Sequence, residues 1–252
     1  MIQRSRREQW RAERALARQL DYQRAKAKAA EGHEHEFVAA MVATSRYVRQ
    51  ALAAVRPLDE AVRVLEVGSG AHGLVFYFGS SRGIGIDPLA AEYAGLFPVW
   101  QHRAPTVAAT GSALPFPDGS FDIVLCDNVV DHAHDPPGIV RETARVLAPG
   151  GVLYFTVNVH HPIYALAAWM HAAANDAGLR LEVGPFADHT VHLTPAGAQR
   201  LFRGLPLRAI HAECDPARAK ERDRRTPPRH AGDNLKRLFY KNAVFTLIAE
   251  RT

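Results

Sequence analysis

A series of short apolar runs separated by helical stretches, between residues 62 and 158, constrains the fold of this chain more than any other feature. The runs are rich in β-branched residues and predict five strands, at residues 62–67, 83–87, 106–110, 121–127 and 151–158. Between the last two lies PPGIVRETARVLAPGG, whose prolines at the start and Pro-Gly-Gly at the end predict a crossover helix. Strands that alternate with helices and are almost continuously apolar indicate a parallel, doubly wound α/β sheet.

The segments on either side of this series complete the expected architecture. Residues 7–55 contain no proline and only Gly32 as a glycine, so we expect helices there, forming an N-terminal helical cap or substrate lid over 1–58. The main domain is then expected at 59–252. It would carry a substrate-side insertion at about 159–195, two closing strands at 206–213 and 242–250, and a basic loop at about 215–237. The result is a mostly parallel seven-stranded sheet with helices on both faces.

Composition excludes several classes of protein. The chain has 252 residues, of which 47% are hydrophobic and 23% charged, as in a globular protein. Its two cysteines, Cys126 and Cys214, are far apart, so we expect neither a disulfide framework nor a zinc site, and a cytoplasmic location. No apolar run approaches the roughly 20 residues of a membrane span, and no membrane partner is expected. The oligomeric state stays open.

The net charge of +5 comes mainly from the arginine-rich start of the chain and from residues 217–237. Basic segments attract nucleic acids, but neither segment carries interleaved aromatic residues on which bases could stack. Binding of a nucleic acid is therefore the weaker interpretation.

The stretch VRVLEVGSGAHG, residues 62–73, predicts a ligand site. It places Glu66 at the end of the first strand and Gly68, Gly70 and Gly73 in the loop that follows. Ligands of open parallel sheets bind at the carboxyl ends of the strands, and glycines let the backbone approach them closely. No Gly-Lys-Ser/Thr of a P-loop follows. The pattern GxGxxG is present, but a dinucleotide site does not explain the acid. A ligand with an ammonium group would explain Glu66, because a carboxylate can bind and orient a positive charge.

A second acid, Asp87, ends the second strand in GIGIDPL. A carboxylate at this place suits the two hydroxyls of a ribose. A ligand with a ribose, a cationic amine and no need for a phosphate cradle is S-adenosylmethionine rather than NAD.

Four blocks of the sequence then resemble a known family. They are Glu66-Val-Gly-Ser-Gly70, Ile86-Asp87-Pro88, LPFPDGSFDIV and ARVLAPGGVLYFTV, and together they span about residues 60–158. The chain is similar to the class I S-adenosylmethionine-dependent methyltransferases, in particular to the small-molecule branch with a type 11-like methyltransferase domain. The resemblance implies transfer of a methyl group from S-adenosyl-L-methionine to an O, N or C atom of a small-molecule or sugar-containing acceptor, leaving S-adenosyl-L-homocysteine.

The resemblance also implies which residues bind the cofactor. Two positions depart from the family pattern: His72 stands where many relatives have the third loop glycine, and Ser112 lies where an adenine-binding aspartate is common. The loop after the first strand would hold the methionine part, Asp87 the ribose, and the later segments the adenine and the methionine amine. The implied cofactor-binding residues are Glu66, Gly68, Ser69, Gly70, Asp87, Pro88, Ser112, Ala113, Leu114, Asp127 and Asn128.

Histidines are the candidate catalytic bases, because an imidazole with a pKa near 6.5 is partly neutral in the cell. His132 follows the fourth strand, and His160 and His161 follow the fifth, so all three are expected at the carboxyl edge of the sheet. Candidate substrate-binding residues are Tyr164, His189 and His192. No HxH or HExxH spacing defines a metal site, and no metal is expected.

Two other functions stay open. The basic segments would suit an RNA methyltransferase or a nucleic-acid-binding protein, although Asp127-Asn128-Val129-Val130 is not the Asn/Asp-Pro-Pro-aromatic tetrad expected of a DNA amine methyltransferase. A non-catalytic binding protein with a methyltransferase fold is the third interpretation.

Overall fold

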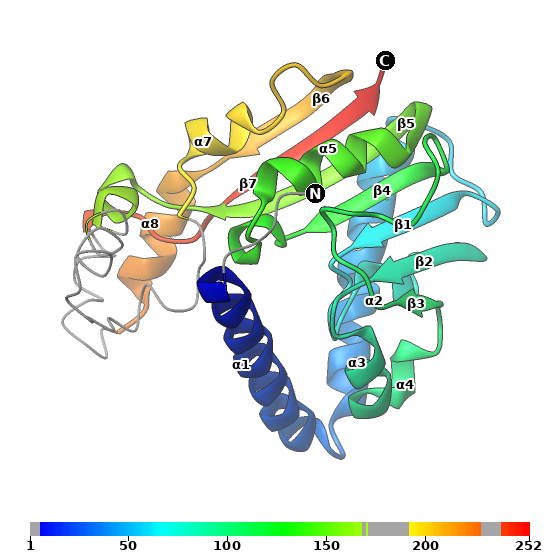
Figure 1. Ribbon diagram of the computed structural model, residues 1–252, viewed down its shortest axis with the longest axis horizontal. Helices are drawn as coiled ribbons and strands as arrows, with labels where there is room; N and C mark the ends of the chain where they lie inside the picture. The colour runs from blue at the N-terminus through cyan, green and yellow to red at the C-terminus, as the bar shows by residue number, and fades with distance from the viewer. Residues whose placement is uncertain (1–5, 168–169, 171–191, 228–237) are drawn as a thin grey trace.

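The computed structural model describes residues 6–167, 170, 192–227 and 238–252, and places one seven-stranded sheet at their centre (Figure 1). The strand order is β3-β2-β1-β4-β5-β7-β6. Strands β1 to β5 are parallel and β7 is antiparallel to both β5 and β6, as expected of a mostly parallel sheet. The strands are Arg63–Val67, Arg82–Ile86, Thr106–Val107, Phe121–Asp127, Leu147–Val159, Leu207–Cys214 and Ala243–Arg251, for β1 to β7.

The apolar side chains of the central strands alternate between two cores, one on each face of the sheet. Leu65 of β1 faces a core that helix α5 (Pro136–Val146) covers. Val64 faces the opposite core, which Val48 and Leu52 of helix α2 (Glu34–Ala53) cover. The prediction of a doubly wound sheet with helices on both faces is therefore confirmed.

Helix α2 covers its face because the helix after the glycine loop is only one turn long, η1 at Leu74–Tyr77. Ser45 of α2 donates a hydrogen bond to the carbonyl of Leu74, at 2.9 Å. Arg49 donates to the carbonyls of Phe78 and Gly79, at 3.0 and 3.2 Å. The N-terminal helices were predicted from composition, but this integration of α2 into the sheet layers was not.

The remaining helices are α1 at the N-terminal side and several short helices between the strands. Helix α1 (Arg6–Ala30) runs away from the sheet, and the chain returns through α2, behind the strands in Figure 1. Gly32, with φ of +79°, lies between these two helices. The short helices are α3 (Ala90–Leu96), α4 (Pro98–Gln101), η2 (Val130–His132) and α7 (Pro195–Arg200).

Three expectations of detail were wrong. The basic segment begins as helix α8 (Pro216–Arg225) and not as a loop, because Asp215 caps its first turn by accepting the N–H of Arg218. The expected strand at 106–110 is reduced to two residues. The crossover helix ends at Val146, and β5 already begins at Leu147, before the Pro-Gly-Gly sequence. Within the described ranges, no helix combines the length and apolar character needed to cross a membrane.

Candidate functional site

Glu66 organises the glycine loop from inside the protein. Its side chain is buried, and its two carboxylate oxygens accept the N–H groups of Leu74 at 3.0 Å and Val75 at 2.8 Å. Burial raises the pKa of Glu66 to about 8, although these two donors favour the charged form. The acid at the end of β1 thus fastens the start of η1. Its predicted contact with the cofactor stays a prediction.

The glycines of the loop leave room for this carboxylate. A Cβ at Gly73 would lie 2.5 Å from Oε2 of Glu66 and 2.7 Å from the carbonyl oxygen of Ser69. A Cβ at Gly68, whose φ is +72°, would lie 2.5 Å from a methyl group of Val129. Position 73 therefore needs glycine because Glu66 is there, which explains why the third glycine follows His72 in this chain.

Helix α4 holds the same loop from the outside. The indole N–H of Trp100 donates to the carbonyl of Ala71 at 2.7 Å. The amide of Gln101 donates to the carbonyls of Gly70 and Ala71, both at 3.0 Å. Trp100 and Gln101 are buried and were not predicted as site residues, because nothing in PVWQ indicates that it packs against a loop 30 residues earlier.

Asp87 meets the glycine loop at the end of the neighbouring strand. The parallel register pairs Val67 with Ile86, so the two strands end side by side. One carboxylate oxygen of Asp87 accepts the N–H of Gly70 at 3.1 Å, and the other accepts that of Leu89 at 2.8 Å. Burial raises the pKa of Asp87. The expectation that the two acids lie at adjacent strand ends is confirmed in its geometry, and Pro88 is exposed beside them.

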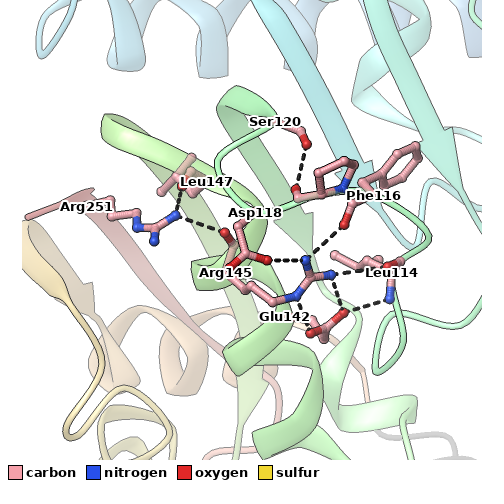
Figure 2. Close-up of polar contacts among 9 residues, drawn as sticks. Leu114, Phe116, Asp118, Ser120, Glu142, Arg145, Leu147 and Arg251 are labelled. Carbon is pink, nitrogen blue, oxygen red and sulfur yellow. Dashed lines mark hydrogen bonds and ion pairs between the residues drawn. The ribbon is translucent and has the colours of Figure 1, made fainter.

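The predicted adenine-side segment is held by α5 (Figure 2). Glu142 accepts the backbone N–H of Leu114 at 2.8 Å. Arg145 donates to the carbonyls of Leu114 and Phe116, and it pairs with the carboxylates of Glu142 and Asp118, both at 2.7 Å. These partners lower the pKa of Glu142 and raise that of Arg145. The loop that contains Ser112 and Ala113 is thus anchored at Leu114 by two residues that the sequence analysis did not single out.

The end of β4 carries Asp127 and Asn128. The hydroxyl of Thr156 donates to the carboxylate of Asp127, and burial raises the pKa of that acid. Asn128 adopts a positive φ of 55° and donates its backbone N–H to the carbonyl of Thr156 at 3.1 Å. The amide of Asn158 donates to the side-chain oxygen of Asn128 at 2.5 Å. A left-handed residue at a strand end is rare outside glycine and turns the chain sharply here.

Three of the predicted acceptor-side residues come together at the end of β5. The ring of His160 is fully buried and lies 5.2 Å from that of His192 and 6.3 Å from that of Tyr164, measured between centroids. Its Nδ1 accepts the backbone N–H of Asn242 at 3.2 Å.

The other predicted histidines lie apart from this group or outside the described residues. His161 packs against the ring of Phe239, at 4.8 Å between centroids. His132 is about half exposed at the end of η2, 3.6 Å from the carboxylate of Asp131. His189 lies outside the described residues.

A cavity of about 250 Å³ opens between the N-terminal helices and the strand ends. Helices α1 and α2 form one wall, and the glycine loop, η1 and the end of β4 form the other. The residues that line it are Lys26, Phe37, Ala40, Met41, Thr44, His72, Leu74 and Asp127. Apart from Asp127, none of these was predicted as a site residue. His72 was noted only as a departure from the glycine pattern.

A larger hollow, about 490 Å³, lies along α8 and is lined by Arg218, Glu221, Arg222, Arg225 and Thr226. It is formed by one helix and includes no residue of the glycine loop, so the smaller cavity is the better candidate site. No group of three or more histidine, cysteine or acidic side chains among the described residues is arranged to hold a metal ion.

Comparison with known proteins identifies the domain. Residues 65–155 match the family model of a methyltransferase domain. Over this segment the chain is similar to the class I S-adenosylmethionine-dependent methyltransferases. An uncharacterized methyltransferase of Mycobacterium sp. (strain JLS) is 41% identical over 100 residues, 37% of this chain and 38% of the relative.

Two further proteins extend the comparison. The ubiquinone biosynthesis O-methyltransferase of Sodalis glossinidius is 30% identical over 134 residues, 51% of this chain and 50% of the relative. The geranyl diphosphate C-methyltransferase of Streptomyces coelicolor, solved with S-adenosyl-L-homocysteine, shares the methyltransferase fold with a TM-score of 0.58 at 14% identity, over 83% of this chain and 79% of the other. The chain thus matches half or less of the length of the curated relatives from Mycobacterium and Sodalis.

Proposed function

We propose that the protein transfers a methyl group from S-adenosyl-L-methionine to an O, N or C atom of a small molecule, with a sugar-containing acceptor included in that class. The observation that carries the proposal is the position of the cavity. It adjoins the glycine loop and the end of β4, where the family resemblance puts the methionine part of the cofactor. The names of the similar proteins, a ubiquinone biosynthesis O-methyltransferase of Sodalis and a geranyl diphosphate C-methyltransferase of Streptomyces, support this class of acceptor.

The residues present fit this cofactor. Gly68 and Gly70 adopt positive φ angles of 72° and 52°, which let the loop backbone turn at the end of β1, where the cofactor would bind. The buried hydroxyl of Ser69 has no hydrogen-bond partner among the described residues. Each oxygen of Asp87 accepts one N–H and keeps a second lone pair, which suits the two hydroxyls of a ribose. When bound, the sulfonium supplies an activated methyl group.

The protein's own part is to position the acceptor and to control its proton. Alignment of the acceptor with the methyl carbon supplies much of the rate of such a transfer, and a closed cavity keeps water out. Of the proposed bases, His132 is about half exposed at the end of η2, whereas His160 is buried with its Nδ1 engaged. We therefore favour His132 as the base for acceptors that lose a proton, and keep His161, His192 and Tyr164 as further acceptor-side candidates.

The alternatives have less support. On α8, Arg222 is 3.3 Å from Asp223 and Arg225 is 2.9 Å from Glu221, so two of its arginines are already paired with acids. This weakens a nucleic-acid interface along that helix. A non-catalytic binding protein would not need a cavity beside the methionine end of the cofactor site.

The decisive test is the affinity of the protein for S-adenosyl-L-homocysteine, measured by calorimetry. The Asp87→Ala variant should bind at least about tenfold more weakly, because hydrogen bonds to a charged group contribute about 1.5–3 kcal/mol. Glu92→Ala is the matched control, since Glu92 is an exposed acid on the neighbouring helix α3. Equal affinity of wild type and Asp87→Ala would remove Asp87 from the site, and no binding by the wild type would refute the proposed function.

A further inference from the structure

His72 occupies an unusual environment for a residue of a glycine loop. Its ring is packed among three aromatic side chains: centroid distances are 4.9 Å to Phe97, 5.4 Å to Trp100 and 5.6 Å to Phe37. Nε2 is buried, and within the described ranges neither ring nitrogen has a hydrogen-bond partner. The ring nitrogens of His72 can therefore form polar contacts only with the faces of the neighbouring aromatic rings or with a ligand in the cavity.

The aromatic neighbours favour one tautomer. Faces of aromatic rings carry partial negative charge and accept weak N–H contacts. The ring of Phe97 meets that of His72 at an interplanar angle of 60°, which suits such a contact with the buried Nε2–H. Nδ1, which is not enclosed, then keeps its lone pair as an acceptor. Burial, with a smaller contribution from Lys26, lowers the pKa of His72 to about 4, so the ring is neutral near pH 7.

Lys26 places a positive charge on the same cavity. It extends from α1, and its Nζ lies 5.6 Å from the centroid of Phe37. No carboxylate of the described part of the chain forms an ion pair with it, and burial lowers its pKa. The one acid on the cavity wall, Asp127, is already bonded to Thr156. A cation with only an aromatic face beside it can gain a full ion pair from an anionic ligand.

The rest of the wall is mostly apolar and the space is small. Phe37, Ala40, Met41 and Leu74 supply apolar surface, and the hydroxyl of Thr44 donates to the carbonyl of Ala40 at 3.0 Å. The volume of about 250 Å³ equals about eight water molecules at roughly 30 Å³ each. A cavity of this volume has room for a single ring with its substituents. The volume lies below the usual range for pockets that bind drug-sized molecules.

We propose that the methyl acceptor is a small, ring-containing organic acid, whose anion pairs with Lys26 and whose hydroxyl or N–H donates to Nδ1 of His72. This inference rests on the proposed function, because it assigns the acceptor of that same site. Lys26 determines the specificity for an anion. His72 is a positioning residue, which orients the donor group of the acceptor over the glycine loop.

The test is calorimetry on the full chain saturated with S-adenosyl-L-homocysteine, with 4-hydroxybenzoate and its neutral isostere 4-hydroxybenzamide as probes. We expect the wild type to bind the acid about tenfold more tightly than the amide, since a charge-assisted contact is worth about 1.5–3 kcal/mol. Lys26→Gln should abolish this preference. Lys28→Gln, which removes an exposed lysine of the same helix, should retain it.

The role of His72 is tested with benzoate, which lacks the hydroxyl. The wild type should prefer 4-hydroxybenzoate to benzoate, and His72→Phe, which keeps a ring in the aromatic cluster, should lose that preference while it still prefers acid to amide. His72→Gln retains an acceptor and should restore part of the hydroxyl preference, which a purely structural role would not produce.

The outcomes separate the two proposals. If S-adenosyl-L-homocysteine binds but acid and amide bind equally, or neither binds at millimolar concentration, the acidic acceptor is refuted and the proposed function stands. An acid preference that survives Lys26→Gln also refutes it. If S-adenosyl-L-homocysteine itself does not bind, the proposed function fails first.

Discussion

Two cations, Arg145 in the last turn of α5 and Lys26 on α1, have opposite surroundings. Arg145 is bonded to two carboxylates and two carbonyls of its own chain. Lys26 lies over one aromatic ring, and no acid of the described chain pairs with it. The predicted adenine-side segment is therefore held by the protein's own groups, whereas the proposed acceptor side leaves a charge that a ligand could neutralise. We therefore expect Lys26, the cation without an acidic partner, to contribute more to the choice of ligand than Arg145 does.

The largest expected effect comes from overpacking the glycine loop, which the protein's own groups hold on both sides. Gly73→Ala places a Cβ against Glu66 and the backbone of Ser69, and we expect it to destabilise the protein by about 3 kcal/mol, at the upper end for overpacking. Gly95→Ala is the control, because a Cβ there meets open space in a helix and should stabilise by about 0.5–1 kcal/mol. Urea unfolding measures both. A Gly73→Ala protein as stable as the wild type would show that the loop is not packed as described.

The comparison of the two cations is tested directly by a pair of substitutions. Arg145→Met should lower the free energy of unfolding by about 2 kcal/mol, since it leaves Glu142 and two loop carbonyls without their donor. Lys26→Gln should change it by less than about 0.5 kcal/mol, as for an ordinary surface substitution. Equal losses of unfolding free energy in the two variants, measured by the same urea titration, would contradict the expectation that contacts within the protein stabilise it through Arg145 but not through Lys26.

The third and smaller effect is the contribution of Glu66 to the pH dependence of the free energy of unfolding. Its pKa is raised from 4.5 to about 8 in the folded protein, so between these values the folded state binds more protons than the unfolded state. Stability from this group is therefore present at low pH and is lost as the pH rises toward and through 8. Between pH 7 and 8 the loss should stay below about 1.4 kcal/mol.

Unfolding of wild type and Glu66→Gln at pH 7 and 8 measures this contribution. The wild type should lose more stability than the variant over that interval. A parallel dependence in the two proteins would mean that Glu66 remains charged, with its two N–H donors outweighing the cost of burial.

The sheet could be predicted because its signals are local. Apolar runs marked all seven strands, and the acids at the ends of β1 and β2 followed from the rule that parallel strands end at one edge. The helix after Asp215 was not predicted although Asp215-Pro216 is a start signal, because PARAKERDRR has almost no apolar residues to mark a buried helix face. The role of Glu66 in fastening η1 could not be read from its position alone.

The acceptor side could not be predicted, because its residues meet only through long-range packing. Lys26 and Phe37 come from different helices, and neither carries a local signature of a cavity. His72 did depart from the glycine pattern, but what surrounds it depends on Phe97 and Trp100 from a later segment. The clamp by Arg145 likewise joins two blocks that the sequence shows only as separate motifs.

The way α2 replaces a longer helix after the glycine loop has a practical consequence for shortened versions of the protein. A chain that starts at residue 33 would lose α1 and with it Lys26 from the cavity wall, yet would keep Val48 and Leu52 over the sheet. Removal of α2 as well would expose one whole apolar face and its strands to aggregation. The boundary at which truncation turns from altered selectivity into insolubility should therefore fall inside α2 rather than at its end.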